Sequence, residues 1–288
     1  MERPEPTASP EPPASITALV RDGVMDAELA ALAWLTIEAG IPVVVAGEPS
    51  GARRAVRDAL LDLLPFAART VTLAGEAETF AWMAEAVELG WRHDGPWAPA
   101  EGSDRVRAGT GDAPVVLVAD LDDGPHGGTW GEHARLLIRA LALGYSAAAT
   151  ARGTRLEDVL GRLAAAPVGA IDDELTRLGV VLILGPDQRG SLRVLAAHYL
   201  RPVARDVHGH IQRLPPAVLA TWNGAVGEFD HFAWGVVAEL GGRTGRRGSE
   251  FEREQAVRAD RLATRAGRLA TRATEPTPAS IPPEPSAG

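Results

Sequence analysis

The residues best placed to do chemistry lie between a β-branched run and a long amphipathic segment, in the stretch GEPSGARR from Gly47 to Arg54. A glycine that ends a strand, followed by a helix, is the layout of a phosphate-binding loop, G-x-x-x-x-G-K-[ST]. There, backbone N–H groups surround phosphate, a lysine reaches the outer phosphates, and a Ser or Thr hydroxyl binds Mg²⁺. With the pattern placed on Gly47, its last three positions read Ala52, Arg53 and Arg54. The spacing is right, but the ammonium and the hydroxyl are missing.

Other residues of the same stretch also oppose phosphate binding. Moving the pattern by one residue keeps Gly51 but puts Ala46 first, and it still provides no magnesium ligand. The Glu48 carboxylate repels phosphate, and Pro49 has no N–H to donate. On this stretch alone we favour an ordinary strand–turn–helix, because short motifs often match by chance. The candidate nucleotide-binding residues are Gly47, Glu48, Pro49, Ser50, Gly51, Ala52, Arg53 and Arg54.

Three acids follow the apolar run PVVLVA of residues 114–119, namely Asp120, Asp122 and Asp123. At the carboxyl end of a parallel strand, acids can position a metal ion or a water molecule, because ligands bind at that edge. Asp is also common after strands as a residue that caps the next turn. Both interpretations stay open, with Asp120 and Asp122 as candidate catalytic residues and Asp120 as the candidate metal ligand.

A second candidate metal motif is D-x-H-x-H at Asp206, His208 and His210. Two histidines spaced two apart on a strand share a face and could bind a metal ion. We favour a hairpin turn around Gly209, because the sequence supplies no further ligand set.

Composition excludes several classes of function. The chain has 288 residues, a net charge of -9 and no cysteine, and all 29 basic residues are arginine. The negative charge argues against a nucleic-acid partner, and the lack of cysteine excludes disulfides and thiolate catalysis. No apolar run reaches membrane-spanning length, and the N-terminus lacks an apolar signal region, so we expect a cytoplasmic protein without a membrane span.

Apolar runs that alternate with helical patterns predict an α/β fold with a mainly parallel sheet covered by helices. The expected strands are residues 41–46, 69–73, 114–119, 146–150 and 178–184. The expected helices are residues 15–23, 25–40, 52–64, 76–89, 130–143 and 156–164.

The pattern changes after Gly190. Residues 191–248 predict a small antiparallel appendage to a first domain of residues 15–190. Residues 249–273 predict one long helix that contains the repeat RLATRA-G-RLATRA. This helix is either a partner-binding or self-associating element or a solvated helix. The Pro- and Glu-rich ends, residues 1–14 and 274–288, predict disordered tails.

Taken in order, the segments from about residue 15 to 185 resemble the type II/type IV secretion and pilus assembly ATPases. The strand and loop at 41–54 match the position of the family's P-loop, and PVVLVADLDD matches its Walker B strand, with Asp120 as the acid. ALALGYSAAATARGTRLEDVLGRL, residues 140–163, resembles the family's histidine box. The resemblance implies a RecA-like P-loop NTPase core, ATP and Mg²⁺ as cofactors, and oligomers with subunits of a secretion or pilus machinery.

The departures from the family fall on the chemistry. The loop lacks its Lys and its Ser/Thr, the catalytic glutamate is replaced at best by Asp122 or Asp123, and Arg152 stands where the box has histidine. We therefore expect a degenerate member, a non-hydrolysing or weakly nucleotide-binding regulatory or structural subunit. The alternatives are a weak but active ATPase that uses Arg53 in place of lysine, and a protein-interaction module that binds no nucleotide.

Overall fold

The computed structural model describes residues 15–65, 68–92, 106–108, 114–124, 128–205, 208 and 210–274. The expected tail of residues 1–14, nearly all of the expected tail of residues 274–288, and Asp206 and Gly209 of the histidine motif lie outside the described residues.

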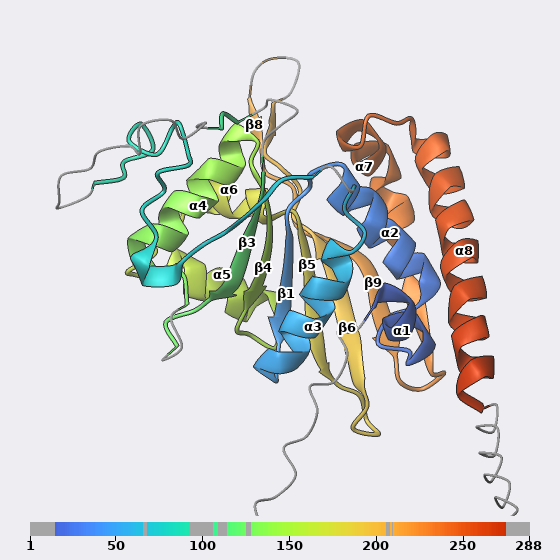
Figure 1. The fold of residues 1–288 in the computed structure, drawn as a ribbon. Coiled ribbons are helices and arrows are strands. Elements are labelled where there is room, and N and C mark those ends of the chain that lie inside the picture. Colours follow the sequence, from blue (N-terminus) through green and yellow to red (C-terminus); the bar gives the residue numbers. More distant parts are fainter. Residues whose placement is uncertain are drawn as a thin grey trace, which may run out of the picture.

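The described strands form one large sheet and one two-stranded ladder (Figure 1). They are β1 (Val43–Gly47), β2 (Thr70–Thr72), β3 (Val115–Leu121), β4 (Ser146–Ala151), β5 (Val180–Pro186), β6 (Leu192–Tyr199), β7 (Ala204–Arg205), β8 (Ile211–Gln212), β9 (Ala217–Asn223) and β10 (Glu228–His231). The eight strands of the large sheet have the order β10-β9-β6-β5-β1-β4-β3-β2. The neighbours β5-β1, β1-β4, β4-β3 and β3-β2 pair parallel, whereas β5-β6, β6-β9 and β9-β10 pair antiparallel. The predicted mainly parallel α/β sheet is thus confirmed.

Helices cover both faces of this sheet. They are α1 (Ile16–Arg21), α2 (Ala27–Glu38), α3 (Ser50–Leu61), α4 (Gly131–Leu143), α5 (Leu156–Ala164), α6 (Asp172–Leu175), α7 (Val237–Arg243) and α8 (Gly248–Thr274). Their ends follow from local chemistry. The side chains of Ser15 and Asp26 accept N–H bonds in the first turns of α1 and α2, and Gly144 ends α4 in the left-handed conformation.

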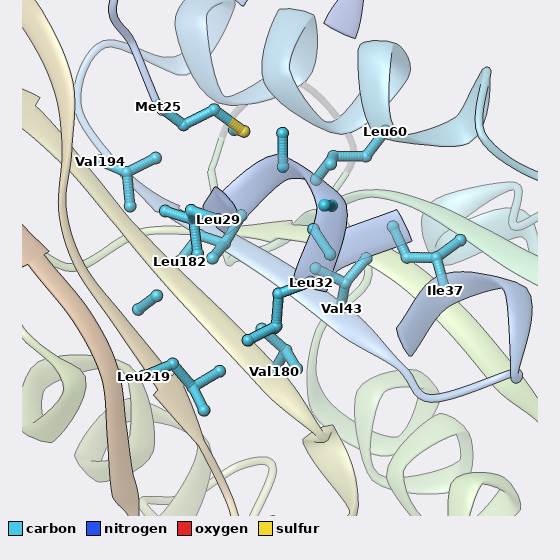
Figure 2. Packing of buried hydrophobic residues seen from close by; sticks show 14 of the residues in the cluster. Met25, Leu29, Leu32, Ile37, Val43, Leu60, Val180, Leu182, Val194 and Leu219 are labelled. Carbon is cyan, nitrogen blue, oxygen red and sulfur yellow. The ribbon is translucent and has the colours of Figure 1, made fainter. Parts of the chain in front are cut away.

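Two apolar layers hold the sheet between these helices. Along β1, Val43 and Val45 face one layer, and Val44 and Ala46 face the other, as the two-residue repeat of a strand requires. The first layer joins the sheet to α2, α3 and α8, and Figure 2 shows its packing around Leu32. The second layer joins the sheet to α4 and α5. Because both faces of β1 are buried, it reads as a continuous apolar run.

The helix predicted for residues 76–89 is wrong. This segment contains a short 3₁₀ turn at Gly75–Ala77 and then irregular turns. The Glu78 carboxylate accepts hydrogen bonds from the N–H groups of Ala74 and Phe80, which fixes a local turn. Further along, the Ala84 N–H donates to Val106 O, a partner outside the segment. The N–H groups of Phe80 and Ala84 thus bond outside the helical pattern, although the N–H of Leu89 still donates to Glu85 O, four residues earlier.

The small antiparallel appendage is not a separate unit. Its main strands β6, β9 and β10 continue the large sheet beyond β5, and among the described strands only β7 and β8 form a ladder apart from it. The reason is the full-length antiparallel pairing of β5 with β6, from Val180–Tyr199 to Pro186–Leu192. The helix α7 that follows was not predicted from the sequence.

The long helix α8 lies along α1, α2 and α7 (Figure 1). Its Phe251 and Leu262 side chains are buried in the first apolar layer. The other side of α8, a helix of 27 residues, is strongly polar. None of the described helices is long and apolar enough to cross a membrane. The apolar seam of the helix is used within the chain.

A histidine on an edge strand holds the start of α2. The Nε2 atom of His231 lies 2.7 Å from Oδ2 of Asp26, whose Oδ1 accepts the N–H of Leu29. Burial alone lowers the pKa of His231, but the hydrogen bond and charge of Asp26, with the charges of Glu28 and Asp230, outweigh it and leave the pKa raised. The contact between His231 and Asp26 ties β10 to the start of α2, most strongly when the imidazole is protonated.

The internal repeat of α8 offers a matched test of its packing. Leu262 is 1% exposed, whereas Leu269, seven residues on, is only partly buried. We expect Leu262→Ala to lower the free energy of unfolding by about 2–5 kcal/mol, and Leu269→Ala by roughly 1 kcal/mol or less, because the second site leaves no cavity. Urea denaturation measures both. Equal losses would contradict the packing of α8 described above.

The His231–Asp26 contact predicts a pH dependence of stability. A pKa raised in the folded state contributes stability that is fully present below the unfolded value of about 6.5 and is lost as the pH rises through the folded value. We therefore expect the free energy of unfolding of the wild type to fall more steeply between about pH 6 and pH 8 than that of His231→Gln. The difference between the two titrations is the readout, since His198, whose pKa burial lowers, is common to both. Parallel curves would exclude the contact as a titrating element.

Candidate functional site

The candidate residues gather where the chain reverses direction across the sheet. After β1 the chain enters α3 on the face of the first apolar layer, whereas after β3 and β4 it enters α4 and α5 on the other face. Since β1 and β4 are neighbours, their carboxyl ends form a switch point, the place where open α/β sheets bind ligands. Glu48 follows β1, Asp120 lies near the end of β3, and Arg152 follows β4.

Arg53 is the centre of this edge. It projects from α3 and is only 2% exposed. Its Nη1 atom donates to the carbonyl oxygen of Gly47 and lies 3.2 Å from Oε2 of Glu48, while Nη2 donates to Oδ1 of Asp120 at 3.0 Å. A buried guanidinium must be neutralised and hydrogen-bonded, so these contacts fix Arg53 against the ends of β1 and β3. The side chain is used internally.

Asp120 is bound on both carboxylate oxygens. Arg53 and Thr150 donate to Oδ1, the latter at 2.6 Å, and the Arg54 guanidinium donates to Oδ2 at 2.7 Å. Burial raises the pKa of Asp120, but the hydrogen bonds from Thr150, Arg54 and Arg53 outweigh it and leave the pKa below its usual value. Asp120 is therefore ionised at neutral pH as the common acceptor of three side chains.

The other acids of the predicted set are paired with a second pair of arginines. Arg152 lies 2.9 Å from Asp122 and 3.8 Å from Glu48, so it bridges β3 and the loop after β1. Arg162 of α5 lies 3.3 Å from Asp122 and 2.9 Å from Asp123. Burial and the hydrogen bond with Asp123 raise the pKa of Asp122 in spite of both arginines. That same hydrogen bond lowers the pKa of Asp123.

These contacts form one continuous cluster, which we call the switch-point network. It contains four carboxylates and four guanidinium groups, so its formal charges cancel. Every charged member contacts at least one member of opposite sign within 4 Å. The members are Glu48, Asp120, Asp122, Asp123, Arg53, Arg54, Arg152 and Arg162.

The loop between β1 and α3 is shorter than its sequence pattern predicts. Because α3 begins at Ser50, only Glu48 and Pro49 lie between the strand and the helix. The N–H groups of Ala52 and Arg53 both donate to the carbonyl oxygen of Pro49 rather than pointing outward. Gly51 belongs to the first turn of the helix, and its absent Cβ would meet no neighbour.

Packing explains the glycine at the end of β1. Gly47 has φ of +130°, and a Cβ there would lie 2.0 Å from the carbonyl oxygen of Leu184 on the neighbouring strand β5. A larger residue would therefore clash with backbone. Glycine is required at position 47 because β1 and β5 pack closely there. An ordinary strand–turn–helix would need glycine at this position for the same reason.

The structure brings together most of the residues predicted from the sequence. Arg53, Arg54, Glu48 and the three aspartates all belong to the network, whereas Ser50, Gly51 and Ala52 are helical residues outside it. Sequence reasoning missed Arg162, which is a member, and Thr150, whose hydroxyl donates to the network residue Asp120. The only signal in the sequence was that Thr150 ends a predicted strand and Arg162 lies in the helix that follows. The strand order was needed to show that both lie close to the aspartates.

Metal-binding geometry is missing from the described part of the chain. No group of three or more His, Asp or Glu side chains there could hold a metal ion. The rings of His208 and His210 lie 6.1 Å apart, as the hairpin interpretation allows. Asp120, the metal ligand proposed from the sequence, has its oxygens bound by arginine and threonine.

The two adjacent arginines give a matched test of the network. Both bind Asp120, but Arg53 is 2% exposed and Arg54 is 44% exposed. We expect Arg53→Ala to lower the free energy of unfolding by about 3–5 kcal/mol, because the substitution removes the donor from buried acceptors and creates a cavity. Arg54→Ala should cost about 0–1 kcal/mol, as exposed ion pairs do. Guanidinium denaturation of both variants is the measurement, and a similar loss for the two would show that Arg53 is not the structural centre.

Comparison with known proteins leaves the family open. No family model matches the sequence, and no curated protein matches it. Among solved structures, the VirB11 ATPase of the Brucella suis type IV secretion system, in complex with sulphate, matches with a TM-score of 0.42 and 17% identity. The match covers 64% of this chain and 54% of that one, so this chain spans about half the length of the ATPase. A likeness at this level carries no conclusion about family, activity or partners.

Proposed function

We propose that this chain is a degenerate relative of the secretion and pilus assembly ATPases that hydrolyses no ATP and acts as a structural or regulatory subunit. The family part of the proposal rests on the order of sequence segments from about residue 15 to 185. The functional part rests on the switch-point network. In this proposal the partners are subunits of a secretion or pilus machinery in the cytoplasm, and the core is RecA-like.

The observation that carries the proposal is the internal pairing of Arg53. A residue that replaces the catalytic lysine must be free to approach phosphate, but this guanidinium is buried against Gly47 O and Asp120. Releasing it would leave the partly buried Asp120 with fewer donors, at a cost of several kcal/mol. The same contact argues against the weak ATPase in which Arg53 takes the place of lysine.

The residues at this edge do not fit a magnesium–nucleotide complex. The position of the magnesium-binding hydroxyl is Arg54, whose guanidinium binds Asp120. The carboxylate of Glu48 stands in the loop, and the N–H groups of Ala52 and Arg53 are turned to Pro49 O. Since the charges of the network cancel, the site has no excess positive charge with which to attract a triphosphate. The same features favour a role in which protein contacts, rather than nucleotide turnover, matter.

A direct test is nucleotide binding and turnover by the purified chain. We expect no phosphate release above background and no magnesium-dependent ATP binding tighter than about 100 µM, equivalent to roughly 5.5 kcal/mol. Isothermal calorimetry with and without magnesium, combined with a phosphate-release assay, measures both. Asp120→Asn serves as the control variant. Turnover that this substitution abolishes, or binding tighter than about 1 µM, would overturn the proposal.

A further inference from the structure

A cavity of about 560 Å³ lies at the amino end of β5, the opposite end of that strand from Gly47. It opens between α5, α6 and the segment of residues 213–216 that leads into β9. Leu200 follows β6 and lines the cavity, and its backbone N–H donates to Gly179 O. Sites for small molecules have about 300–1,000 Å³, so the cavity is large enough for one.

The interior of this cavity is apolar and its rim is charged. Such a combination is what small-molecule sites share, because an apolar lining supplies burial and a few polar groups orient the ligand. Four charged side chains line the rim, Asp172, Asp173, Arg201 and Arg213. The apolar lining consists of Leu160, Gly161, Ala164, Leu175, Leu200, Leu214, Pro215 and Pro216.

Gly161 leaves the cavity open beside α5, although a glycine lowers the stability of the helix. It is an interior residue of the nine-residue helix α5, and glycine is the least favourable residue there apart from proline. A Cβ at Gly161 would meet nothing within 4 Å, so close packing does not require the glycine. Gly161 and Ala164, one turn later, are both small, so the side of α5 that lines the cavity carries little side-chain volume.

The rim carries one carboxylate more than its arginines neutralise. Arg213 binds Asp173 through two hydrogen bonds of 2.6 and 3.1 Å, and Arg201 is paired with Glu239, which is not part of the lining. The side chain of Asp172 makes no hydrogen bond or ion pair with the described residues, although its charge helps to raise the pKa of Arg213. An unpaired carboxylate at the mouth of an apolar cavity complements a cation.

We propose that this cavity binds a small amphiphilic molecule with an apolar body and a cationic amine end. The body occupies the space beside Gly161 and Ala164, and the ammonium group lies at the rim beside Asp172. Neither the network at the other end of β5 nor a nucleotide takes part, so the inference stands apart from the proposed function.

Three probes that share one apolar body test the proposal, namely phenylbutylamine, phenylbutanol and phenylbutanoate. Calorimetry on the full chain at about 0.15 M salt should show the amine binding best, with a Kd of about 1 mM or tighter, and the carboxylate binding least. Asp172→Asn should weaken the amine by up to about fivefold and leave the alcohol within about twofold. Failure of all three probes, or tightest binding of the carboxylate, would overturn the proposal.

Variants of α5 locate the binding. Gly161→Leu occupies the part of the cavity beside α5 and should weaken the amine at least about tenfold, whereas Ala165→Leu adds the same side chain outside the lining and should leave binding unchanged. Gly161→Ala should raise Tm by about 2–4 °C, because only helix propensity changes, which also shows that the position tolerates a side chain. Unchanged amine binding by Gly161→Leu would place the ligand elsewhere, for example on the acidic surface, and so refute the site.

Discussion

The buried guanidinium of Arg53 is the constraint on which this edge of the protein depends. An arginine that is 2% exposed needs opposite charge and acceptors within reach, and here they come from the end of β1, the loop after it and β3. Because β4 separates β1 from β3, the side chain spans the end of β4, where Thr150 donates to the same carboxylate. Arg53 thus joins α3 to β1 and β3, and the Thr150 hydroxyl ties β4 to the same carboxylate.

This contact lies at the switch point of the sheet. Open parallel sheets bind ligands at the switch point, and there the chain places four acids against four arginines. Paired charges of this kind cost desolvation energy and add little net stability, so their value lies in a defined geometry. The carboxylates at this edge are thus bound by arginines of the same chain.

Helix α5 connects the two regions of interest. From its last turn Arg162 reaches Asp122 and Asp123 of the network, while the neighbouring Gly161 and Ala164 line the apolar cavity on another side of the helix. Arg162 also lies over the ring of Trp130, 5.5 Å from its centroid, which holds the side chain between α5 and α4. A short helix with these contacts has little freedom to move without disturbing one of the two.

The sequence by itself determined the strands and most helices, because these depend on local patterns. The β-branched run at Val43–Gly47 predicts a strand buried on both faces, and Gly144 marks a helix end through its own chemistry. The α/β class, the position of the acids after the apolar run of residues 114–119 and the lack of the P-loop Lys and Ser/Thr residues followed in the same way.

Tertiary structure decided what no local pattern contains. The order β5-β1-β4-β3 brings Thr150 and Arg162 to Asp120 and Asp122, and pairing of β5 with β6 makes the expected appendage part of the main sheet. Contacts of Glu78 and Val106 overrode strong helix formers in residues 76–89. In each case the deciding partner is distant in sequence or is a side chain competing for backbone bonds, and propensity is too weak a term to outweigh such contacts.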